Sequence, residues 1–124
     1  SGKLEEGTVV SVSTSGKGDV VASNVAYDKR IVGVVSGANG IKTGLMLRQT
    51  ESIADGDVPV ALSGRVYVKA IGKIQAGDFL TTSNTEGFAM KVKSYRKAKG
   101  AIIGKALTDS DGNSGLVLVL LNAK

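Results

Sequence analysis

The sequence contains no cysteine, no histidine and no tryptophan, and it has a single proline. The absence of cysteine excludes disulfides, thiolate nucleophiles, zinc–thiolate sites and iron–sulfur clusters. The absence of histidine removes the usual general base near neutral pH, the Ser-His-Asp triad and the commonest metal ligand. Few side chains suited to catalysis remain. We therefore expect a non-enzymatic protein without a metal or cofactor.

Long apolar runs and targeting signals are also missing. The longest purely apolar run, Leu116 to Leu121, is far shorter than the roughly 20 residues that cross a bilayer. No basic-then-apolar leader opens the sequence, so we expect neither a signal peptide nor membrane insertion. The first three residues, Ser1 to Lys3, are typical of an expression scar or a processed terminus. We predict a flexible N-terminal segment over 1–6 and a single β-rich domain over 7–124.

The sequence is rich in short valine-containing runs. Of 124 residues, 42% are hydrophobic and 17 are glycine, and Gly, Asn, Asp and Ser clusters separate the apolar runs. We predict strands at Thr8–Val12, Asp19–Ala22, Ile31–Val35, Gly44–Arg48, Val58–Ser63, Arg65–Ala70, Asp78–Thr82, Phe88–Val92, Ala101–Ala106 and Leu116–Leu121. A helical turn is expected only at Ser94–Lys99, ended by Gly100. Ten short strands predict an all-β fold: a compact antiparallel sandwich or barrel, or a β-clip.

Glycine positions refine this prediction. We expect turns with positive φ at Gly16, Gly18, Gly56, Gly77, Gly87 and Gly112. Gly33 and Gly104 lie inside apolar runs, which indicates bulges or a close approach of two backbones. Pro59 is expected on an edge strand or at a strand entrance.

Segments in the first part of the sequence resemble segments about 70 residues later. Gly7-Thr8-Val9-Val10-Ser11 matches Gly77-Asp78-Phe79-Leu80-Thr81, and Ile31–Val35 matches Ile102–Ala106, at offsets of 70 (7 to 77) and 71 (33 to 104). An internal repeat, with two halves built on the same hairpin arrangement, would explain this similarity, and so would generic β-patterning.

Two polar clusters are candidate chemical sites. The segment Asp109-Ser110-Asp111-Gly112-Asn113 has the spacing of a calcium loop but lacks its glycine and its bidentate glutamate, which favours a β-hairpin turn. A Ser-Lys dyad is the one nucleophile–base pair that the composition leaves open. Its candidate members are Ser36, Ser63 and Lys69, although nothing in the sequence fixes the lysine beside either serine.

Two other segments are candidate partner surfaces. The net charge is +5, and a stretch without acidic residues carries Lys91, Lys93, Arg96, Lys97, Lys99 and Lys105. It predicts a solvated face or one that docks a polyanion; nucleic acid is disfavoured because Tyr95 is the only aromatic residue there. The continuous apolar run Leu116–Leu121 is typical of a strand covered on both faces or lying in a subunit interface. Leu116, Leu118 and Leu120 are the candidate interface residues.

A set of blocks carries a resemblance to known domains. They are residues 27–37 (YDKRIVGVVSG), 58–69 (VPVALSGRVYVK), 77–83 (GDFLTTS), 87–91 (GFAMK), 100–107 (GAIIGKAL) and 115–120 (GLVLVL). Together they resemble the β-rich terminal domains of bacterial surface and phage tail-fibre-like proteins. They are also similar to the β-clip-type domains of phage capsid decoration proteins.

The resemblance implies assembly, often as trimers, rather than catalysis. We therefore expect a structural module in a virion or on a cell surface that associates with itself and with capsid, fibre or surface proteins. Two alternatives stay open: a binding module that docks a polyanionic partner through the 91–105 face, and an autoproteolytic fibre domain.

Overall fold

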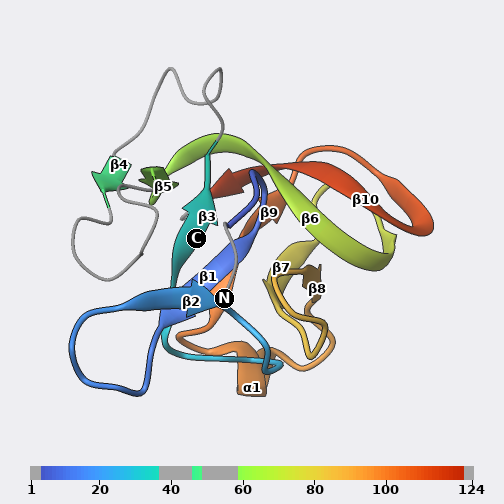
Figure 1. Ribbon diagram of the computed structural model, residues 1–124. Helices are drawn as coiled ribbons and strands as arrows, with labels where there is room; N and C mark the ends of the chain where they lie inside the picture. The colour runs from blue at the N-terminus through green and yellow to red at the C-terminus, as the bar shows by residue number, and fades with distance from the viewer. Residues whose placement is uncertain (1–3, 37–45, 49–58, 122–124) are drawn as a thin grey trace.

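Ten strands and one short helix make up the computed structural model, which describes residues 4–36, 46–48 and 59–121 (Figure 1). The first five strands are β1 (Val9–Val12), β2 (Val20–Ala22), β3 (Ile31–Val35), β4 (Met46–Arg48) and β5 (Pro59–Ala61). The other elements are β6 (Gly64–Ile74), β7 (Phe79–Thr82), β8 (Ala89–Lys91), α1 (Tyr95–Ala98), β9 (Ile102–Ala106) and β10 (Ser110–Leu121). The prediction of an all-β fold with ten strands is confirmed.

The strands form an open sheet and a closed barrel. The open sheet has the order β2-β1-β3-β5-β4, and the barrel has the order β10-β6-β8-β7-β9. Every strand pair is antiparallel except β6 with β8, which meet in parallel at one residue pair, Ala70 opposite Ala89. The predicted antiparallel barrel is confirmed, and the one parallel contact, between β6 and β8, closes it.

The same strand pairing occurs twice. Val10 lies opposite Ala22 in β2 and opposite Gly33 in β3, and the register then shifts by a bulge. Seventy residues later, Leu80 lies opposite Lys91 in β8 and opposite Gly104 in β9, and a bulge follows at the same step. The outer strands agree too, since β5 pairs with β3 as β10 pairs with β9. The structure thus confirms the internal repeat and relates β1, β2, β3 and β5 to β7, β8, β9 and β10.

Hydrogen bonds outside the strands repeat as well. Gly7 N donates to Val35 O just as Gly77 N donates to Ala106 O, both at 2.8 Å. Ser23 N donates to Val9 O, and the equivalent Val92 N donates to Phe79 O. Generic β-patterning would not reproduce individual bonds at matching offsets, so the two halves share one backbone plan.

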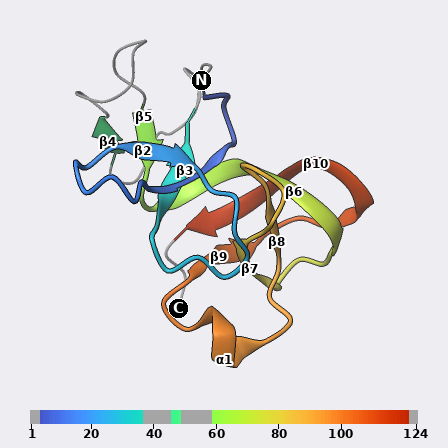
Figure 2. The same cartoon turned by 60° about the horizontal axis from the view of Figure 1, so that its bottom comes forward.

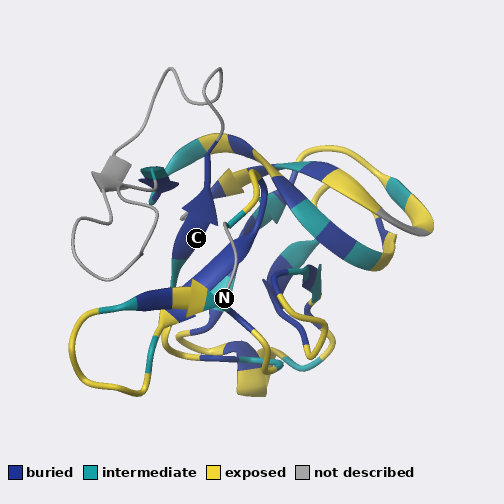
Figure 3. Ribbon diagram, in the orientation of Figure 1, coloured by how far each residue is buried: buried dark blue, intermediate teal, exposed yellow. Residues whose placement is uncertain are grey.

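One hydrophobic core joins the sheet to the barrel. Val9, Val34 and Ala61 of the sheet pack in the same buried cluster as Val68, Val117 and other barrel residues. A second cluster, with Val10, Val35 and Val60, lies on the opposite face of the sheet. Figure 3 shows the buried residues concentrated where the sheet meets the barrel.

Two strands are longer than predicted. β6 and β10 contain 11 and 12 residues and form an antiparallel ribbon that twists across the molecule in Figures 1 and 2. The hairpin turn predicted at 109–113 is wrong, because residues 110–113 lie within β10. The reason is local: Gly112 faces Gly72, both have positive φ, and the register shift that follows Gly112 lets the ribbon continue through turn-forming residues.

The other local predictions agree with the structure. Helix α1 begins after Ser94, whose Oγ accepts a hydrogen bond from Lys97 N, and Gly100 follows it with φ +81°. Five of the six glycines expected in turns have positive φ; Gly56 lies outside the described residues. Pro59 is the first residue of β5, at a strand entrance.

The flexible segment predicted for 1–6 stays a prediction. Within it, Leu4 packs against the second cluster and Glu5 Oε1 lies 3.2 Å from Lys69 Nζ. No helix in the described part of the chain is long and apolar enough to cross a membrane.

Candidate interaction surfaces

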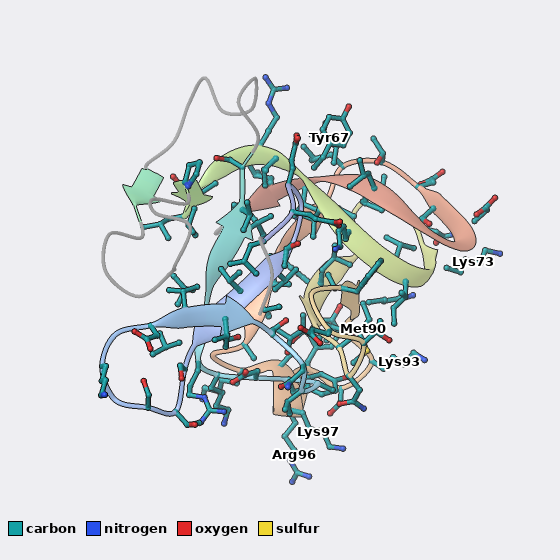
Figure 4. All side chains as sticks on the ribbon, in the orientation of Figure 1. Tyr67, Lys73, Met90, Lys93, Arg96 and Lys97 are labelled. Carbon is teal, nitrogen blue, oxygen red and sulfur yellow. The ribbon has the colours of Figure 1, made fainter. Side chains whose placement is uncertain are left out.

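The outer face of the β6–β10 ribbon presents an exposed apolar row. Strand alternation turns Val117, Val119 and Leu121 into the barrel, so the residues between them face outward. Leu116 is 58% exposed, Leu120 is 38% exposed and Leu118 is half-buried. Tyr67, opposite Leu118 on β6, is 51% exposed and points away from the body of the molecule in Figure 4. We call Tyr67, Leu116, Leu118 and Leu120 the apolar row.

Two cations flank the apolar row from β6. Arg65 lies opposite Leu120, and Lys69 lies opposite Leu116. The Lys69 amine is 3.2 Å from Glu5 Oε1 and 4.9 Å from the centre of the Phe88 ring, so its charge is partly satisfied within the chain. The sequence predicted the three leucines of this row but not Tyr67, because a cross-strand neighbour cannot be identified without the register.

The six basic residues predicted as one face separate into two sets. Lys91 and Lys105 have partners inside the fold: Lys91 Nζ lies 3.6 Å from Asp78 Oδ2, and Lys105 Nζ lies 5.1 Å from the centre of the Phe79 ring. The other four are exposed and make no ion pair with any described residue. We call Lys93, Arg96, Lys97 and Lys99 the basic face; the first three are labelled below the barrel in Figure 4.

The polar clusters do not assemble into chemical sites in the described structure. Lys69 contacts Glu5 and Phe88, while Ser36 Oγ donates a hydrogen bond to Pro59 O. Asp109 Oδ1 accepts a hydrogen bond from Ala76 N at 2.7 Å, which ties the start of β10 to the β6–β7 turn. Among the described residues, no group of three or more carboxylates is arranged to hold a metal ion.

A groove opens where β6 and β8 diverge beyond their single pair. It has a volume of about 540 Å³. We call it the β6–β8 groove; it is lined by Ile71, Gly72, Lys73, Gln75, Asp78, Met90, Lys91 and Lys93. Lys73, Met90 and Lys93 are labelled on this side of the molecule in Figure 4. Sequence reasoning missed the groove, because it depends on two strands parting after one residue pair.

Comparison with known proteins does not show a family. No protein-family model matches the chain, and no curated protein matches it. Among solved structures, the chain is similar to the head fiber gp8.5 N base in bacteriophage phi29, with 18% identity and a TM-score of 0.49 over 96% of this chain and 85% of that one. A likeness at this level carries no argument about function, which has to come from the chain's own residues.

Proposed function

We propose that this chain is a non-enzymatic structural module that self-associates, as a trimer, in a virion or cell-surface assembly such as a fibre end or a capsid decoration. The virion setting rests on the resemblance of the sequence blocks to fibre-like and decoration domains. The likeness to the phage head fibre base is too distant to add weight.

The apolar row is the observation that carries the proposal. None of its residues belongs to the buried barrel core, and three of the four are more than a third exposed. Burying one leucine side chain contributes about 1.5–3 kcal/mol, so covering several neighbouring side chains can hold subunits together. The apolar row lies on β6 and β10, two long strands that pair with each other. Because a rigid backbone holds side chains in fixed positions, this location favours a specific interface.

The test substitutes the most exposed leucine of the row. Light scattering should give the wild type a mass near three times 12.7 kDa. Leu116→Glu should dissociate it to a monomer that keeps the wild-type circular dichroism spectrum, because a charge in a dry interface is costly whereas one facing water is not.

The matched control is Val25→Glu. Val25 is 48% exposed and lies between β2 and β3, away from the row, so this variant should keep the wild-type mass. A wild type that stays monomeric at high micromolar concentration, or a Leu116→Glu variant that keeps its mass, would contradict the proposal.

We also propose that the basic face docks a polyanionic partner. Its four cations surround one short helix, and none is neutralised by a described residue. Binding of a labelled poly-glutamate chain should weaken steeply with salt. The double variant Arg96→Gln/Lys97→Gln should bind several-fold more weakly, whereas Lys17→Gln, at an exposed lysine in the turn between β1 and β2, should not. Salt-independent binding, or equal losses in both variants, would remove this role.

A further inference from the structure

The turn between β7 and β8 docks onto the first half of the molecule through Gly87. Gly87 N donates to Ser23 O at 2.7 Å, and Gly87 O accepts from Val9 N at 3.0 Å. A Cβ on Gly87 would lie 3.0 Å from Thr8 Cγ2 and 3.9 Å from Ala22 Cβ, and its φ is +79°. A glycine in a left-handed conformation is thus what allows this turn to approach the β1 and β2 backbones.

The second half of the repeat (β7 to β10) has the β6–β8 groove at the position that corresponds to the docking site of Gly87. Under the repeated pairing, Thr8 corresponds to Asp78 and Ala22 corresponds to Lys91. Both of these counterparts line the groove, as does Gln75, the counterpart of Glu5. The first half therefore holds a docked turn where the second half has an open groove.

The turn equivalent to the docked one is exposed. The β1–β2 turn spans Ser13–Asp19 and is closed by a Ser13 N to Asp19 O bond, as the β7–β8 turn is closed by Ser83 N to Phe88 O. Gly18 corresponds to Gly87 and has a similar φ of +86°. No atom lies within 4 Å of a Cβ built on Gly16 or Gly18.

The exposed turn and the groove lie at opposite ends of the molecule. Figures 1 and 2 both place the β1–β2 turn at one side and the diverging part of β6 at the other. A copy cannot fill its own groove with this turn, whereas a neighbouring copy can.

We propose that the Ser13–Asp19 turn of one copy docks in the β6–β8 groove of the next. Gly18 would lie against Asp78 and Lys91, the counterparts of Thr8 and Ala22, as Gly87 lies against those two residues within one copy. The contact is head-to-tail, so it propagates into an open chain of copies unless the rotation closes a ring. It deepens the proposed self-association but uses a different surface from the apolar row.

Charge should make this contact weak and tunable. Lys73, Lys91 and Lys93 line the groove, with Asp78 paired to Lys91. The docked internal turn carries Glu86 before its glycine, whereas the exposed turn carries Lys17 before Gly18. Like charges meet in the wild type, so head-to-tail association should strengthen as salt rises. Lys17→Glu, which copies the internal turn, should strengthen it further at low salt.

The absence of cysteine allows a direct test by cross-linking. An equimolar mixture of Lys17→Cys and Lys93→Cys, treated with a short bismaleimide, should give at least about tenfold more heterodimer than a mixture of Lys17→Cys and Lys29→Cys, because docking raises the local concentration. Lys29, like Lys93, is exposed, but it lies outside the groove. Equal yields from the two mixtures would overturn the proposal.

A second measurement separates this contact from the apolar row. Repeating the cross-linking with Leu116→Glu in every variant should preserve the excess, whether or not the row holds subunits together. Loss of the excess would show that the turn does not dock by itself. A charge cycle adds a check by sedimentation: Lys17→Glu and Lys93→Glu should each strengthen association, and their combination should associate more weakly than Lys17→Glu alone. Additive effects would contradict a direct encounter of the two positions.

Discussion

Two glycines set how closely neighbouring strands approach each other. A Cβ on Gly33 would lie 2.3 Å from Ala61 O, and a Cβ on Gly104 would lie 2.2 Å from Leu120 O. Both glycines sit beside a bulge at the same step of the repeated pairing. The sequence predicted close approach at these two positions from glycine inside an apolar run, and the structure confirms it.

We expect Gly104→Ala to lower the free energy of unfolding by about 2–4 kcal/mol, because the new methyl group meets backbone that cannot rotate away. Gly33→Ala should cost a similar amount. Gly16→Ala is the control: it meets no atom within 4 Å, so only its positive φ opposes it, at about 1 kcal/mol. Urea unfolding measures all three, and a Gly104→Ala variant as stable as Gly16→Ala would contradict this account.

At the scale of elements, the sequence predicted each strand, but not the full length of β6 and β10. The run Leu116–Leu121 was visible because its apolar residues are continuous, whereas the start of β10 contains turn-forming residues. Only the opposite strand explains why they are extended: β6 supplies Gly72 across from Gly112. The parallel contact between β6 and β8 was likewise hidden, because one residue pair leaves no periodic signal.

The loop before β3 holds the start of α1. Tyr27 Oη accepts hydrogen bonds from Lys93 N at 3.1 Å and from Ser94 N at 3.2 Å. Tyr27→Phe should lower the free energy of unfolding by about 1–2 kcal/mol, since both amides lose their acceptor. Tyr95→Phe should change it by less than about 0.5 kcal/mol, because Tyr95 is 61% exposed and its hydroxyl bonds no described residue. Equal effects in chemical unfolding would show that Tyr27 does not hold the helix.

At the scale of the whole molecule, the two halves share a plan but differ in what covers them. The second half is closed into a barrel by β6, and its turn docks on the first half; the first half is an open sheet with a free turn. Offsets near 70 in the sequence were enough to suggest the repeat. The groove was not predictable, because it depends on β6 and β8 parting after a single residue pair.

The candidate surfaces were predicted unevenly for physical reasons. The leucines of the apolar row follow from alternation along one strand, which the sequence displays directly. The basic face has four residues where six were predicted, because Lys91 pairs with Asp78 and Lys105 lies over the Phe79 ring. A run of basic residues is visible in the sequence, whereas the residues that pair with them across a sheet are known only from the strand topology.

Self-association is the central claim, and sedimentation velocity of the wild type from low to high micromolar concentration tests it most directly. The account predicts a sedimentation coefficient that rises with concentration above that of a 12.7 kDa monomer, with Leu116→Glu removing the rise due to the apolar row. A single monomeric species over the whole range, at both low and high salt, would contradict it.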